Sequence, residues 1–219
     1  MGESYKEVLT RFIQEQEAEA AILTEQAVQY VAEEFEKDAG NVKSAVNMAM
    51  SRLEKDGNIF RISKGVYCKR IETAFGVYVP DKDKLFCRRL LRDNGNTVGY
   101  ETGLSGLNRL GLVSQIPRKI YIASNFYRKR VPEDVQVEVK KPPVTVNDEN
   151  CRYLQILDAI NDMDKAAVDA AHPAAILKKA AEELALDTDK LIFLARKHYS
   201  NKTLIRTIDI LLEGKYETA

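Results

Sequence analysis

The sequence has few of the residues that metal centres and nucleophilic enzymes require. Its 219 residues include only three cysteines, Cys68, Cys87 and Cys151, and two histidines, His172 and His198. The cysteines are widely spaced and form no C-x-x-C pair, so a zinc site is not indicated and we expect reduced, partly buried thiols. Reduced thiols are typical of a cytoplasmic protein, which is the location we predict.

Long apolar runs and leader sequences are also lacking. No run of about 18 apolar residues occurs, so no membrane span is predicted. The N-terminus has no basic start followed by an apolar core, and no signal peptide is expected. Glycine loops of the G-x-x-x-x-G-K-[ST] or G-x-G-x-x-G type are absent as well. We therefore expect no enzyme active site, no cofactor and no metal.

The net charge is zero, but the charges are unevenly distributed along the chain. Residues 1–40 carry three basic and ten acidic side chains, whereas residues 41–70 carry seven basic and two acidic ones. Residues 81–141 carry thirteen basic and seven acidic side chains. Basic blocks of this kind favour an anionic partner.

Apolar periodicity predicts two domains of an α+β protein. Residues 1–72 are expected to form the first domain, and residues 80–219 the second. The elements expected in the first are an amphipathic helix over 4–20, a helix that follows Thr24 as its N-cap, a helix over 42–56 that ends before Gly57, and strands 58–62 and 65–70 joined by a hairpin turn.

The second domain is expected to combine a small β-sheet with C-terminal helices. Its predicted elements are helices over 82–93 and 101–110, strands over 120–124 and 135–139, and helices after Cys151 with Pro173 at a first helical position and Asp187 and Asn201 as caps.

Three helices followed by a two-stranded hairpin is the element order of a winged helix-turn-helix domain. In such a domain the third helix enters the major groove of double-stranded DNA and the hairpin lies along the backbone. Short polar side chains beside long cations suit base edges and phosphates. The candidate DNA-binding residues are Lys43, Ser44, Asn47, Ser51, Arg52, Lys55, Arg61, Lys64, Lys69 and Arg70.

Two further basic runs form a second candidate patch for DNA or for a toxin-related partner. Its residues are Arg88, Arg89, Arg92, Arg128, Lys129 and Arg130, the first three of which we expect on roughly one helical side. The alternative interpretation of both surfaces is a solvated polar face, and winged helices also serve as protein-docking modules. Asp158, Asp162 and Asp164 are likewise expected on a solvated helix face.

Residues 24–70, with AMSRLEKDGNIFRISKGVY at their centre, resemble the winged helix of the AbiEi family of bacterial antitoxins. The block VGYETGLSGLNRLGLVSQIPRKIYIAS (98–124) is similar to a family block in which a helix ends in Leu-Gly-Leu. A Thr/Ser-Gln-x-Pro turn and an aromatic-containing strand follow there, and here they are Ser114–Pro117 and Ile120–Ile122. The resemblance extends over about residues 24–213 and leaves out the first helix.

This resemblance implies a type IV toxin–antitoxin system of the kind used in phage defence. The winged helix would bind operator repeats in its own promoter and repress the operon. The C-terminal domain would counteract AbiEii, a nucleotidyltransferase toxin, without the need for a stable complex. The alternative is a winged-helix transcriptional regulator that has no toxin partner, and a neighbouring gene for a nucleotidyltransferase would distinguish the two.

Overall fold

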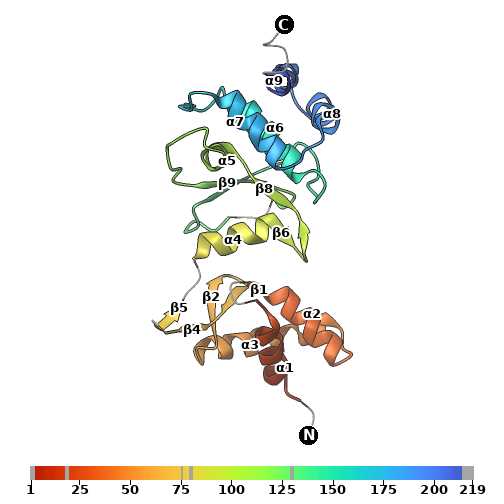
Figure 1. The fold of residues 1–219 in the computed structure, drawn as a ribbon. Helices are drawn as coiled ribbons and strands as arrows, with labels where there is room; N and C mark the ends of the chain where they lie inside the picture. The colour runs from red at the N-terminus through yellow and green to blue at the C-terminus, as the bar shows by residue number, and fades with distance from the viewer. Residues whose placement is uncertain (1–2, 18–19, 75, 79–80, 129–130, 214–219) are drawn as a thin grey trace. The chain divides into compact units, whose positions relative to one another are not determined.

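The chain folds into two compact units of mixed α+β structure, each described here by itself. The computed structural model describes residues 3–17, 20–74, 76–78, 81–128 and 131–213. Met1–Phe86 form the N-terminal unit and Cys87–Ala219 the C-terminal unit. Figure 1 shows helices and short strands in both units.

The N-terminal unit combines three helices with a three-stranded sheet. In chain order its elements are α1 (Tyr5–Glu15), β1 (Ala21–Leu23), α2 (Thr24–Glu34), α3 (Ala39–Lys55), β2 (Ile59–Ser63), β3 (Val66–Lys69), β4 (Ile71–Thr73) and β5 (Gly76–Tyr78). The sheet order is β1-β3-β2 with both pairs antiparallel, and β4 pairs with β5 alone. Thr73 and Gly76–Tyr78 lie between the two predicted domains, and they belong to the β4–β5 hairpin.

The core of this unit forms where the apolar stripes of the helices meet the sheet. Helix α1 buries Val8, Leu9, Phe12 and Ile13, and α3 buries Val42, Val46, Ala49, Met50 and Leu53. Both sets recur at helical spacing, so each helix presents one apolar face. Each fully buried large side chain contributes about 1.5–3 kcal/mol relative to exposure. This burial fixes which face of α3 remains outside.

The ends of these helices follow local capping chemistry. Ser4 and Glu7 form a capping box at the start of α1. The hydrogen bonds that the Glu7 carboxylate accepts from Ser4 lower its pKa. Helix α1 ends at Glu15, shorter than the predicted 4–20. Helix α3 begins three residues before the predicted start because the Asp38 side chain caps it, accepting from the backbone N–H of Gly40 at 2.8 Å.

Strand β1 was not predicted, and it changes the role of Thr24. Ala21–Leu23 pairs with β3, so Leu23 rather than Thr24 occupies the N-cap position of α2. The backbone N–H and the hydroxyl of Thr24 both donate to the carbonyl oxygen of Gly65, at 3.0 and 3.2 Å. Gly65 lies in the turn of the predicted β2–β3 hairpin, with a φ of 75° that favours glycine.

The C-terminal unit places a small sheet against a layer of helices. Its elements, beginning with a helix that contains the division between the units, are α4 (Lys82–Leu91), β6 (Arg92–Asp93), β7 (Asn96–Thr97), β8 (Gly99–Glu101), α5 (Gly103–Arg109), β9 (Ile120–Ser124), β10 (Val137–Lys140), α6 (Cys151–Asp162), α7 (Pro173–Glu183), α8 (Thr188–His198) and α9 (Asn201–Leu212). The sheet order is β10-β9-β8, and β9 is antiparallel to β8 but parallel to β10.

Helix α6 is central in this unit, because it contacts β8, α5, α7, α8 and α9. The prediction of a mixed α+β chain with small sheets and C-terminal helices is confirmed. Pro173 begins α7 and Asp187 caps α8 as predicted, but Ser200 rather than Asn201 caps α9. None of the described helices is long and apolar enough to cross a bilayer.

Candidate nucleic-acid interface

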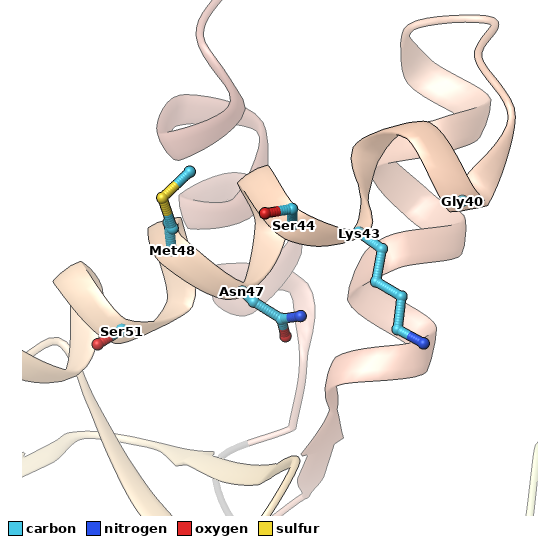
Figure 2. A pocket seen from close by; sticks show the side chains of 6 residues that line it. All are labelled: Gly40, Lys43, Ser44, Asn47, Met48 and Ser51. Atoms are coloured by element: carbon cyan, nitrogen blue, oxygen red, sulfur yellow. The ribbon is translucent and has the colours of Figure 1, made fainter.

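The outer face of α3 carries a continuous stripe of mostly small and polar residues. They recur at helical spacing on the side opposite the buried residues and line one shallow hollow, formed by Gly40, Lys43, Ser44, Asn47, Met48 and Ser51. Figure 2 shows Lys43 and Asn47 extending to one side of this stripe and Met48 extending to the other. The structure therefore brings together four of the predicted DNA-binding residues, and it adds Met48 to them. We call these six residues the α3 stripe.

The cations between residues 3 and 74 fall into two groups. Five are exposed and make no hydrogen bond or ion pair with another described residue; they are Lys43, Arg52, Lys55, Arg61 and Lys64. All five lie on α3 or on the β2–β3 hairpin. We call them the free cations.

The other cations between residues 3 and 74 have partners. Lys6 pairs with Asp56 at 2.7 Å, and Arg11 pairs with Glu3 at 3.1 Å and with Glu34 at 2.7 Å. Lys37 donates to the Tyr5 hydroxyl at 3.0 Å. The cations around α1 and α2 thus have partners nearby, whereas the five on α3 and the hairpin have none among the described residues.

Lys69 and Arg70 lie apart from the α3 stripe. The Lys69 ammonium donates to the backbone carbonyl of Gln14, near the end of α1, at 2.9 Å. A cation is favoured there because the last carbonyls of a helix are partly negative and lack partners within it. Arg70 donates to the carbonyl of Gly57 at 3.2 Å and pairs with Glu72 at 3.4 Å. Both residues line a pocket together with residues of α1. Because both side chains have partners in the chain, neither belongs to the free cations.

The second predicted patch is only partly assembled on one helix. Arg88 and Arg89 lie in the last turn of α4, but Arg92 follows the helix in β6 and donates to the carbonyl of Gly95 at 3.2 Å. The expected common helical side of the three arginines therefore does not form, because α4 ends at Leu91. Arg128 lies over the ring of Tyr127 at 5.4 Å, while Lys129 and Arg130 fall outside the described residues.

A buried polar cluster in the C-terminal unit was not foreseen. Asp158, expected on a solvated face, is only 6% exposed. Its carboxylate accepts hydrogen bonds from the hydroxyls of Tyr100 at 3.2 Å, Thr102 at 2.6 Å and Tyr199 at 2.7 Å. The prediction is wrong for Asp158 because α6 packs against β8 on the side that was taken as free. Asp164 does lie at the surface, where it pairs with Arg206 at 2.7 Å.

The hydrogen bonds of this cluster are suited to a structural role. Burial, together with the nearby Asp158 carboxylate, raises the pKa of both Tyr100 and Tyr199, so the two phenols remain protonated donors. Lys140 of β10 approaches the same carboxylate at 3.4 Å. An open pocket of about 320 Å³ adjoins the cluster and includes His198, whose pKa is lowered by burial and by Lys197. The cluster joins β8, β10 and α6 to the end of α8.

Neither the Cys68 and Cys151 thiols nor a group of metal-ligating side chains indicates a reactive site in the described residues. Burial raises the pKa of the Cys68 and Cys151 thiols, which keeps them protonated and unreactive near neutral pH. Within the same part of the chain, no group of three or more His, Cys, Asp or Glu residues could hold a metal ion. The α3 stripe with the free cations is consequently the surface whose chemistry points most directly to a ligand.

Comparison with known proteins gives a family but no activity. No curated protein matches the sequence. The model of one protein family, described as a family of unknown function (DUF6088), matches residues 23–184, from the end of β1 into the segment after α7. This match includes α2, α3, the β2–β3 hairpin and the sheet of the C-terminal unit, and it spans well over half of the chain. The chain therefore belongs to the DUF6088 family.

Proposed function

We propose that the N-terminal unit is a winged helix that binds double-stranded DNA. Helix α3 would be the recognition helix, and the β2–β3 hairpin would be the wing. The element order, with β1 between the first two helices and the hairpin after the third, supports this assignment. The observation that carries the proposal is the separation of the cations between residues 3 and 74: every free cation lies on α3 or the hairpin, and the others have partners among the described residues.

The dimensions of α3 suit the major groove. Its 17 residues give a rod about 25 Å long at 1.5 Å per residue. A helix with its side chains is about 10–12 Å across, close to the width of about 12 Å of the major groove of B-form DNA. In this arrangement Ser44, Asn47 and Ser51 face base edges together with Arg52, and the remaining free cations neutralise phosphates.

The DNA site we propose is an operator in the promoter of the protein's own gene, which places the protein in the cytoplasm. The resemblance to AbiEi antitoxins supports a second role, in which the C-terminal unit counteracts a nucleotidyltransferase toxin. The block that carries this resemblance is continuous in the structure as β8, α5 and β9. Co-expression of the chain with a nucleotidyltransferase encoded beside it would separate this role from that of a regulator without a toxin: relief of growth arrest supports the former.

A salt titration tests DNA binding directly. Each phosphate neutralised contributes about −0.9 to the slope of log affinity against log salt, so the four free cations assigned to phosphates predict a slope of about −3.6. Fluorescence anisotropy with a duplex from the promoter, and with a random duplex of equal length, measures this slope. Lys64→Ala should make the slope less steep by about 0.9 on both duplexes.

Lys69→Ala provides the matched control, since it removes the same charge from the neighbouring strand. Because its bond to the Gln14 carbonyl holds Lys69 at the end of α1, apart from the α3 stripe, its loss should leave the salt slope nearly unchanged. A salt-independent affinity, or no effect of Lys64→Ala on the slope, would show that the free cations are a solvated surface.

A further inference from the structure

Met48 is an apolar side chain at one edge of the otherwise polar α3 stripe. It is 56% exposed, whereas Met50 two residues later is fully buried in the core. Ser44 lies one turn before Met48 and Ser51 lies one turn after it, and all three line the same hollow. In Figure 2 the thioether of Met48 extends away from the helix axis. A single exposed apolar residue is ordinary in itself, and it is the position of this one that has a consequence.

The surroundings of Met48 determine what it could contact. The free cations Lys43 and Arg52 lie on α3 within five residues of it, and neither has a partner in the described chain. A surface with uncompensated positive charge on both sides of an apolar group suits a ligand that is anionic at its margins and carries an apolar group between them. Duplex DNA has this chemistry, because its phosphates border a groove whose floor includes apolar groups.

Only one base presents an apolar group in the major groove, namely thymine with its C5-methyl. We infer that Met48 contacts a thymine methyl and makes an A·T pair a specificity element of the bound DNA. This inference rests on the proposed DNA binding by α3 and names the base that the helix selects. A methionine suits the contact because its flexible, polarizable thioether adapts to an apolar partner.

Asn47 adds a second group with the same preference. Its amide has no hydrogen bond to another described residue, and it extends from the other side of the stripe. An asparagine amide can form two hydrogen bonds to the N6 and N7 atoms of adenine. Because the two side chains leave α3 on different sides, they would contact neighbouring base pairs rather than one pair. We therefore expect adjacent A·T pairs beneath this part of the helix.

The test removes one methyl group from the DNA and nothing else. The full-length protein is first used to select a binding site from a library of random duplexes. Each thymidine of that site is then replaced, one at a time, by deoxyuridine, which keeps every hydrogen-bonding group and lacks only the C5-methyl. Affinity should fall by about fourfold at the thymine under Met48, since burial of one methyl or methylene group has about that effect, and should hardly change elsewhere.

Variants of the protein assign this effect to Met48. Met48→Ala should weaken binding to the thymine site and should abolish the difference between thymine and uracil at that one position. Met48→Leu, which keeps an apolar side chain of similar size, should retain the difference. Ser51→Ala is the neighbouring control, and it should leave the sensitivity to uracil in place. Since Met48 is exposed, its substitution should leave the thermal unfolding of the chain unchanged.

The outcomes separate this inference from the proposal on which it rests. Salt-dependent binding with a uracil effect that disappears in Met48→Ala supports the inference. Salt-dependent binding with no uracil effect, with no selected sequence, or with an effect that persists in Met48→Ala overturns the inference and leaves DNA binding intact. If no duplex binds with a salt-dependent affinity, DNA binding and the inference both fail, and the exposed methionine then suits a protein partner.

Discussion

Removal of the Asp158 carboxylate should destabilise the C-terminal unit strongly. Asp158→Ala leaves the hydroxyls of Tyr100, Thr102 and Tyr199 without their common acceptor. A hydrogen bond to a charged group contributes about 1.5–3 kcal/mol, and loss of one partner from a buried charged network costs about 3–5 kcal/mol. We therefore expect the free energy of unfolding of this unit to fall by about 4 kcal/mol.

Native-state hydrogen exchange measured by mass spectrometry is the appropriate assay, because peptides from α6 report on the opening of the C-terminal unit alone. Asp164→Ala is the control, since Asp164 belongs to the same segment but forms exposed ion pairs with Lys202 and Arg206. Such pairs contribute little, and the α6 amides should exchange nearly as in the wild type. Asp158→Asn keeps the shape and one acceptor oxygen, so its effect should be about half that of alanine.

The reasoning would be refuted if Asp158→Ala lowered the opening free energy of α6 by less than about 1 kcal/mol, the contribution of one ordinary hydrogen bond. It would also be refuted if Asp158→Ala and Asp164→Ala had equal effects. Either result would mean that the three hydroxyls find other acceptors when the carboxylate is removed.

Two further changes test the same unit. The pKa of Tyr199 is raised by burial and by Asp158. The folded chain therefore keeps a phenol proton that the unfolded chain loses above about pH 10. The contribution of this group to the free energy of unfolding is fully present below that pH, and it falls by about 1.4 kcal/mol per pH unit above it. Tyr100 adds an equal decline because its pKa is raised by the same causes. Tyr199→Phe should therefore remove about half of the total decline, which urea denaturation at about pH 9 and about pH 11 would measure, and an unchanged decline would contradict the assignment. At Gly99, an added Cβ would lie 2.3 Å from the carbonyl oxygen of Leu90 and 2.8 Å from that of Ala123. Gly99→Ala should therefore cost about 3 kcal/mol in thermal unfolding, and a loss below about 1 kcal/mol would show that the backbone yields easily.

The helices and the hairpin of the N-terminal unit could be predicted because their signals are local. The apolar stripe of α3, the glycine after it and the hairpin glycine Gly65 all act within a few residues of sequence. Strand β9 coincides with the predicted 120–124 for the same reason. Strand β1 could not be predicted in this way, because its three residues are extended only through pairing with β3, more than 40 residues later.

The candidate site shows the same division between local and distant causes. Periodicity places Lys43, Ser44, Asn47 and Ser51 on the outer face of α3. The same spacing could have placed Met48 there, one turn after Ser44, but Met48 was not among the predicted residues. The orientation of the Lys69 side chain depends on its hydrogen bond to Gln14, 55 residues away near the end of α1, and no local pattern indicates it. Burial of Asp158 likewise depends on strand β8 and Tyr199, which lie far from it in sequence.

The double hydrogen bond from Thr24 to Gly65 has a consequence for the kinetics of association. It anchors the hairpin turn beside Lys64 to the start of α2. In the proposed complex with DNA, the hairpin would bind in the conformation that it already has, and no loop would have to become ordered during the encounter. Association would accordingly proceed in one step at a rate set by diffusion and long-range charge attraction. Thr24→Val removes the hydroxyl bond and keeps that of the backbone N–H, so it should loosen the turn and slow association.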